Sequence, residues 1–180
     1  MNNIPAYTTN KTDTGTRKVR FLFESIGKES IVKAIEYSPI KTSQGTTIFN
    51  LGFGDYIDDK EGISDDINSN NGDMRRVFST VLSTVPIFFS STSNSALWVQ
   101  GSDSDDTFRA KCILNCTKNC SDICKNQGRR IKAYRYYVDK NFTELCKEYI
   151  FFGLSVDDGT TLVQYVPGSN YQGILIYKKK

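Results

Sequence analysis

The sequence predicts a single α+β domain, built on a largely antiparallel sheet of about six to seven strands with two to three helices. The chain has 180 residues, of which 38% are hydrophobic, and this is enough for one domain with a substantial core. Segments typical of strands follow one another with helical segments inserted, without a regular strand–helix alternation. We expect the domain over residues 19–180, after a flexible polar tail at residues 1–18.

Seven segments are rich in the β-branched and aromatic residues typical of strands. In chain order they are VRFLFESIG from Val19, SIVKAIEYSPI from Ser30, TTIFNLGFGDY from Thr46, ALWVQG from Ala96, EYIFFGL from Glu148, TLVQYV from Thr161 and GILIY from Gly173. The first two meet at Gly27 and Lys28, a spacing typical of a hairpin.

A helix is predicted from Asp73 onward, because apolar residues there recur at steps of three and four. They are Met74, Val77, Phe78, Val81, Leu82, Val85, Phe88 and Phe89. Asn71 or Asp73 is expected to cap the helix, and Pro86 to kink it or end its regular part early. Its polar face is expected to carry Ser79, Thr80, Ser83 and Thr84. After Gly128, RRIKAYRYYVDKN resumes helical spacing.

The stretch CILNCTKNCSDIC places cysteines at every fourth position in a chain without histidine. If Cys112 to Cys124 is one helix, the outer cysteines lie about 18 Å apart, so they cannot share one metal ion. The favoured interpretation is therefore a helix face of small buried residues, with no metal and no cofactor. Two alternatives stay open, a regulatory disulfide and metal binding by Cys112, Cys116, Cys120 and Cys124.

The absence of histidine also excludes Ser-His and Cys-His nucleophile pairs, and the chain has no phosphate-binding glycine loop. Catalysis is therefore disfavoured. A metal-dependent hydrolase built on Asp55, Asp66 and Asp73 is the third functional hypothesis.

An anion-binding site is predicted where SNNGDMRR opens the first helix. Arg75 and Arg76 occupy the turn in which the helix dipole disfavours cations, so a bound phosphate or carboxylate would relieve the conflict. The amides of Asn70 and Asn71 would complete the site. The alternative is that both arginines pair with neighbouring acids.

Charge is distributed unevenly, although the formal net charge is only +3. Seven acids and one base lie between Asp55 and Asp73, and nine bases and two acids lie between Arg109 and Lys140. The basic surface is expected to include Arg129, Arg130, Lys132, Tyr134 and Arg135. Such a surface suits a nucleic acid or an acidic partner, and self-association through the acidic segment would use the same asymmetry.

These observations favour a non-enzymatic binding or regulatory module, with a protein partner or self-association, and keep nucleic-acid or nucleotide-phosphate binding as the alternative. The chain shows no secretory leader and no stretch long enough to span a membrane. We therefore expect a cytoplasmic protein that does not bind membranes. In that compartment its five cysteines stay reduced.

Several short motifs together resemble an uncharacterised family of small bacterial proteins, known mainly from Bacteroidota and described only as a domain of unknown function. The motifs are FESIG, FNLGFGD, SNNGD with VFSTVLSTV, then GS, RIKAY and FFGL, and the resemblance runs from Phe21 to Tyr177. In the family a Gly-Ser turn leads almost directly into an Arg-x-Arg-x-Tyr helix, which corresponds here to Arg130, Lys132 and Tyr134. The resemblance thus implies that the cysteine-rich segment, at about residues 104–128, is an insertion.

Overall fold

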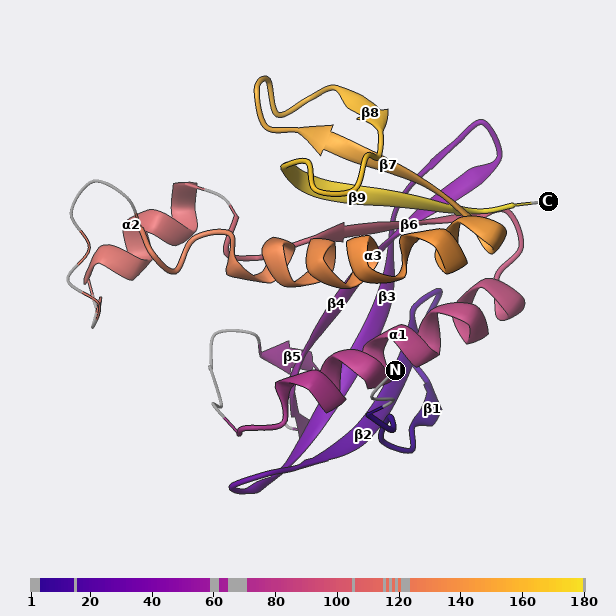
Figure 1. Ribbon diagram of the computed structural model, residues 1–180. Helices are drawn as coiled ribbons and strands as arrows, with labels where there is room; N and C mark the ends of the chain where they lie inside the picture. Colours follow the sequence, from indigo (N-terminus) through magenta and orange to yellow (C-terminus); the bar gives the residue numbers. More distant parts are fainter. Residues whose placement is uncertain are drawn as a thin grey trace. The chain divides into compact units, whose positions relative to one another are not determined.

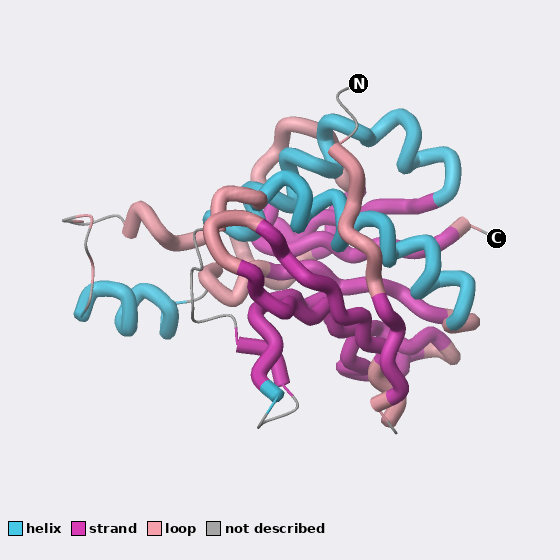
Figure 2. The backbone as a smooth tube through the Cα atoms, turned by 90° about the horizontal axis from the view of Figure 1, so that it is seen from below, coloured by secondary structure: helices cyan, strands magenta, loops and turns pink. Residues whose placement is uncertain are grey.

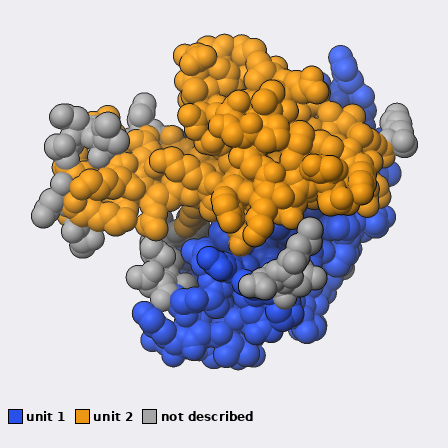
Figure 3. All heavy atoms as spheres, viewed as in Figure 1, with its two compact units in different colours: residues 1–95 blue, residues 96–180 orange. Residues whose placement is uncertain are grey.

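The computed structural model describes residues 4–14, 16–58, 62–64, 71–104, 106–114, 116, 118, 120 and 124–179. The chain divides into two compact units, Met1–Ser95 and Ala96–Lys180, which Figure 3 shows in blue and orange. Each unit is described by itself, and the single domain expected over residues 19–180 stays a prediction. The described residues contain nine strands and three helices, so the class is α+β, as predicted.

The first unit contains a meander of antiparallel strands and one helix (Figure 1). Its elements are β1 (Asn10–Asp13), β2 (Val19–Ile26), β3 (Ser30–Ser43), β4 (Thr46–Ile57), β5 (Gly62–Ser64) and α1 (Met74–Ser91). Neighbours in sequence pair in space from β1 to β4, and β5 adds to β4. The hairpin expected at Gly27 and Lys28 is present, because Ile26 pairs with Ser30.

The prediction of six to seven strands was too low because β1 and β5 were missed. They contain four and three residues, and their sequences, NKTD and GIS, lack an alternation of apolar and polar residues. Backbone pairing with β2 and β4 makes them strands, and pairing of this kind leaves no periodic signal in the sequence.

The apolar face of α1 packs on β3 and β4 through aromatic contacts. The ring of Phe88 lies 4.3 Å from that of Tyr37 and 5.1 Å from that of Phe49, centroid to centroid. The ring of Phe78 lies 5.5 Å from that of Phe53. The helix does not end at Pro86 but continues to Ser91.

The division of α1 into an apolar and a polar face was predicted only in part. Val77, Phe78 and Val81 are buried as expected, but Thr80 and Thr84 are fully buried as well. The hydroxyl of Thr84 donates to the carbonyl of Val81 and shares a 2.7 Å hydrogen bond with the hydroxyl of Tyr37. The two threonines therefore lie within the buried face because their hydroxyls have internal partners.

The segment before β1 contacts α1. Tyr7 is buried, and its backbone N–H donates to the Thr80 hydroxyl over 2.9 Å. The hydroxyl of Ser79 donates to the carbonyl of Ile4. This segment and β1 together span much of the tail that the sequence predicts to be flexible.

The second unit is a four-stranded antiparallel arrangement with two helices. Its elements are β6 (Ser95–Gln100, of which Ser95 belongs to the first unit), α2 (Asp106–Leu114), α3 (Arg129–Glu148), β7 (Tyr149–Ser155), β8 (Leu162–Gln164) and β9 (Tyr171–Lys178). The strand order is β6-β9-β7-β8. Phe142 of α3 contacts Phe151 and Tyr165, with ring centroids 5.9 and 5.7 Å apart, so α3 covers this sheet. None of the helices in the described part of the chain has the length and apolar character needed to cross a bilayer.

The prediction of a continuous helix from Cys112 to Cys124 is wrong. Helix α2 ends at Leu114, and Cys116, Cys120 and Cys124 are not helical. Figure 2 draws the described parts of the chain between α2 and α3 as loop. Between the cysteines the sequence supplies mainly Asn, Thr, Ser and Asp, which favour turns because their side chains compete for backbone hydrogen bonds.

Val81→Asp tests the packing of α1, since the Val81 side chain is 1% exposed. The substitution buries an unpaired carboxylate and is expected to lower the free energy of unfolding by roughly 3 kcal/mol or more. Ser83→Asp, at an exposed position of the same helix, is the matched control and should change it by no more than about 0.5 kcal/mol. Urea denaturation measures both, and equal stability of the two variants would contradict the packing described above.

Candidate functional site

Asn71, predicted to bind an anion, instead joins the β2–β3 hairpin to the start of α1. Its side chain is buried, and its amide group donates to the hydroxyl of Ser25 and the carbonyl of Glu29, each over 3.0 Å. Its side-chain oxygen accepts from the N–H of Glu29 over 2.9 Å. A Cβ at Gly27 would lie 2.0 Å from the carbonyl oxygen of Asn71, so only glycine permits this approach.

The same network includes Asp73. Its carboxylate accepts from the hydroxyls of Ser25, at 2.6 Å, and Tyr7, at 2.8 Å, and makes no side-chain cap bond to α1. Burial and the bond to Asp73 raise the pKa of Tyr7. The guanidinium of Arg76 lies 3.9 Å from the centre of the Tyr7 ring, a cation–π contact. Asp73 and Arg76 therefore both bind Tyr7.

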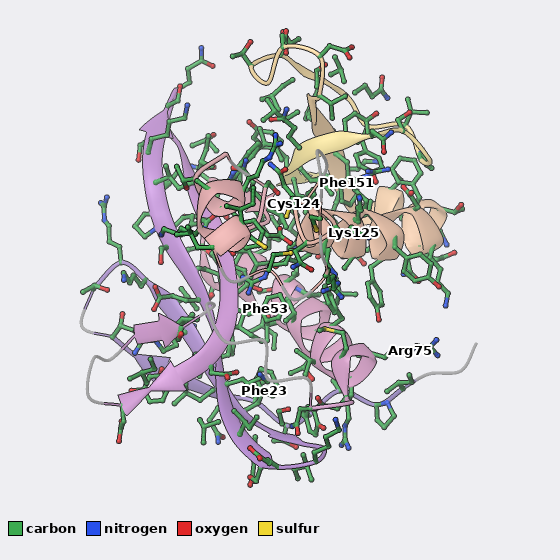
Figure 4. The ribbon with its side chains drawn as sticks, turned by 90° about the vertical axis from the view of Figure 1, so that its left-hand side faces the viewer. Phe23, Phe53, Arg75, Cys124, Lys125 and Phe151 are labelled. Carbon is green, nitrogen blue, oxygen red and sulfur yellow. The ribbon has the colours of Figure 1, made fainter. Side chains whose placement is uncertain are left out.

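The anion-binding hypothesis retains little of its predicted residue set. Asn70 lies outside the described residues, and Asn71 and Arg76 have the internal contacts given above. Arg75 is exposed and has no ion pair within the described part of the chain; Figure 4 shows it beside α1. The site stays a prediction that depends on Arg75 and the free N–H groups of the helix.

The described acids of the hydrolase hypothesis have different structural partners and do not form one site. Asp55 forms an ion pair with the buried Lys33, Asp73 accepts from two hydroxyls, and Asp66 lies outside the described residues. Since both described carboxylates have internal partners, their arrangement gives no support to this hypothesis.

The basic surface predicted around α3 is present in part. Arg129, Lys132, Tyr136 and Lys140 are exposed and, by their spacing of three and four residues, share one face of the helix. We call this set the basic face of α3. Tyr134, which was predicted to belong to the surface, is buried, and Arg135 is half-buried.

Arg130, also predicted for the surface, helps to hold the start of α3. Its guanidinium donates to the hydroxyl of Ser102 over 2.6 Å, and its backbone N–H donates to the carboxylate of Asp103 over 3.0 Å. The N–H of Gly128 donates to the carbonyl of Asp103 over 2.8 Å. Asp103 is 5% exposed and caps a helix that begins far along the chain. The sequence has several acids and serines around Asp103, but their spacing does not indicate that one of them caps α3.

Asp139 lies between the basic residues of α3, and its carboxylate is hydrogen-bonded within the protein. It accepts from the hydroxyl of Tyr165 over 2.7 Å and from the N–H of Gly168 over 3.2 Å. Burial, followed by the bond to Asp139, raises the pKa of Tyr165. The negative charge of Asp139 thus holds the 165–168 segment on α3.

The four clustered cysteines line one pocket together with Arg109 and Ile113. The sulfur atoms of Cys116 and Cys120 are 3.4 Å apart. The backbone of Lys118 and then that of Cys120 donate to Cys116 and lower its pKa to about 7. Figure 4 shows sulfur atoms, in yellow, near Cys124. The tertiary structure thus gathers thiols that a single helix would keep apart.

Asn71→Asp tests whether Asn71 has the structural role described here. The isosteric carboxylate cannot donate to Ser25 and Glu29 and would face the Glu29 carbonyl, so we expect a loss of about 2–3 kcal/mol in unfolding free energy. Asn10→Asp, at an exposed position, introduces the same chemical change and should be nearly neutral. An equally small effect of both substitutions in urea denaturation would contradict this role.

Comparison with curated proteins and with solved structures gives no match. Comparison with family models gives a match over residues 3–121, which is most of the chain and includes α1, α2 and the first cysteines of the segment. The match confirms the expectation of a family without known function. The chain belongs to the family of unknown function DUF6934.

Proposed function

We propose that this protein is a non-enzymatic binding module for nucleic acid, and that it binds through the basic face of α3. One observation carries the proposal: Arg129, Lys132, Tyr136 and Lys140 are exposed along one side of a regular helix. From Arg129 to Lys140 this face extends about 17 Å, at 1.5 Å per residue. Phosphates along a nucleic-acid backbone would each release counterions when they meet these cations.

The aromatic residue at the centre of the basic face favours a single-stranded ligand. Tyr136 is 60% exposed, and the ammonium of Lys140 lies 5.9 Å from the centre of its ring. Proteins that bind single strands combine cations for the phosphates with exposed aromatic rings on which bases stack. Tyr136 would supply the stacking surface and Lys140 the neighbouring cation.

The acids near this face do little to neutralise it. Asp103 binds the start of α3 and Asp139 binds Tyr165 and Gly168, as described above. Glu144 forms an ion pair with Lys147 at 2.7 Å. The positive potential of the remaining cations is therefore available to a partner in solution.

Binding is a better proposal than catalysis because Asp55 and Asp73, the described acids of the hydrolase hypothesis, are engaged in structural contacts and the chain contains no histidine. We place the protein in the cytoplasm, where nucleic acid is accessible. An acidic protein or a second copy of the chain is the competing partner for the same face.

The test is fluorescence anisotropy with a labelled single-stranded oligonucleotide of about 20 nucleotides, over a range of salt concentrations. The native chain should bind at low salt, and Lys132→Ala with Lys140→Ala should weaken binding about tenfold or more. This double variant should also reduce the slope of log K against log salt by about 1.4, or 0.7 per lost phosphate contact. Tyr136→Ala should weaken binding by about 1–3 kcal/mol.

Lys28→Ala with Lys41→Ala is the matched control, because it removes the same charge from exposed positions of the first unit. It should leave the affinity nearly unchanged. Equal losses in the two double variants would indicate only a response to net charge, and absence of binding at low salt would reject nucleic acid as the ligand.

A further inference from the structure

We propose that Cys112, Cys116, Cys120 and Cys124 form a tetrathiolate site for one structural Zn²⁺ ion. This inference replaces the sequence-based preference for a metal-free helix face, because the continuous helix on which that preference depended is not present. It is independent of the proposed nucleic-acid binding, since it concerns what folds the segment between β6 and α3.

The contacts among the thiols carry the first step. Cys116 and Cys120 are in sulfur–sulfur contact at 3.4 Å, and Cys112 and Cys124 line the same pocket. In a tetrahedral site with Zn–S bonds of about 2.3 Å, sulfur atoms are about 3.8 Å apart. Among the described residues no group of three or more ligands is already placed to hold a metal ion, so loading requires these side chains to move from thiol–thiol contact to metal coordination.

The composition of the pocket points to the metal. Its candidate ligands are the four thiols of Cys112, Cys116, Cys120 and Cys124, and a tetrahedral site with four sulfur ligands suits zinc. The three residues between successive cysteines lie within the two-to-four range typical of structural zinc sites.

The cysteine segment lacks the apolar core that would otherwise keep it folded. None of the described residues from Thr107 to Cys124 is buried, and the large apolar side chains of Ile113 and Leu114 are 58% and 80% exposed. Helix α2 has nine residues, too few for stability without tertiary support. A structural metal is one of the means by which a small segment without a core is stabilised.

The surroundings of the pocket suit a negatively charged metal centre. Zn²⁺ with four thiolates has a net charge of −2, and Arg109 lines the pocket. Lys111, Lys118 and Lys125 are exposed on the same segment. The N–H of Lys125 donates to the sulfur of Cys120 over 3.3 Å, and the side-chain amide of Asn126 donates to the sulfur of Cys112 over 3.4 Å. Donors of this kind orient thiolate ligands and disperse their charge.

The segment also begins and ends at one place, as a segment folded around a metal should. Asp103 binds the N–H groups of Gly128 and Arg130, so the chain leaves β6, forms the cysteine segment and returns to the same point. The ends are therefore fixed by a hydrogen-bonded base, and the proposed ion would fix the thiols within the segment.

The test uses the full chain, reduced and freed of metal under anaerobic conditions, and titrated with Co²⁺. We expect one Co²⁺ per chain, with the intense visible absorption of a tetrahedral tetrathiolate complex, and its displacement by one equivalent of Zn²⁺. Zinc should also slow proteolysis between residues 104 and 128. Cys116→Ser and Cys124→Ser should each weaken Co²⁺ binding by about 100-fold or more.

Cys146→Ser is the matched control, because Cys146 is the fifth cysteine and lies in α3, outside the pocket. This variant should bind Co²⁺ as the native chain does. Absence of the tetrathiolate spectrum in the native chain would overturn the proposal whatever the variants do. A spectrum that Cys146→Ser abolishes, or that Cys116→Ser and Cys124→Ser both retain, would also overturn it.

Discussion

The second unit depends on one buried residue, Asp103. Its carbonyl and carboxylate accept from the N–H groups of Gly128 and Arg130, so a single residue after β6 both closes the base of the cysteine segment and caps α3. Gly128, in the left-handed conformation with φ of 67°, gives the chain the turn that the approach requires. The orientation of the basic face of α3 follows from this contact, because the register of a helix is set by its first turn.

Asn71 and Asp73 have the corresponding role in the first unit. A chain of hydrogen bonds runs from Asn71 through Ser25 to Asp73, which also accepts from Tyr7. It joins the β2–β3 hairpin, the start of α1 and the amino-terminal segment. The side chains of Asn71 and Asp73, which suggest a ligand site in the sequence, thus have hydrogen-bond partners within the fold, and groups with internal partners specify a structure more than they recognise a ligand.

The two proposals assign different cations to different tasks. A zinc tetrathiolate would attract Arg109 and the lysines of the cysteine segment, whereas Arg129, Lys132 and Lys140 lie on α3 and remain available to a ligand. The long run of bases in the sequence therefore has two functions in this interpretation: local charge compensation in the segment and recognition along the helix. Their separation in the fold explains why total net charge, +3 for the chain, is a poor guide to either.

The sequence by itself determined the α+β class, seven of the nine described strands by position and the helical stripe of Val77, Val81 and Phe88, because periods of two and near four are properties of local backbone geometry. It did not determine the short strands β1 and β5 or the burial of Thr80 and Thr84, which depend on partners distant in the chain.

The same limit applies to the candidate sites. The exposed cations of α3 followed from spacing, but Tyr134 and Tyr136 were separated into core and surface only by packing. The gathering of four cysteines required α2 to end at Leu114, and the capping of α3 required Asp103 to meet Arg130. Such contacts are decided by the tertiary structure, because sequence spacing describes which residues share a face of one element and carries no information on which elements meet.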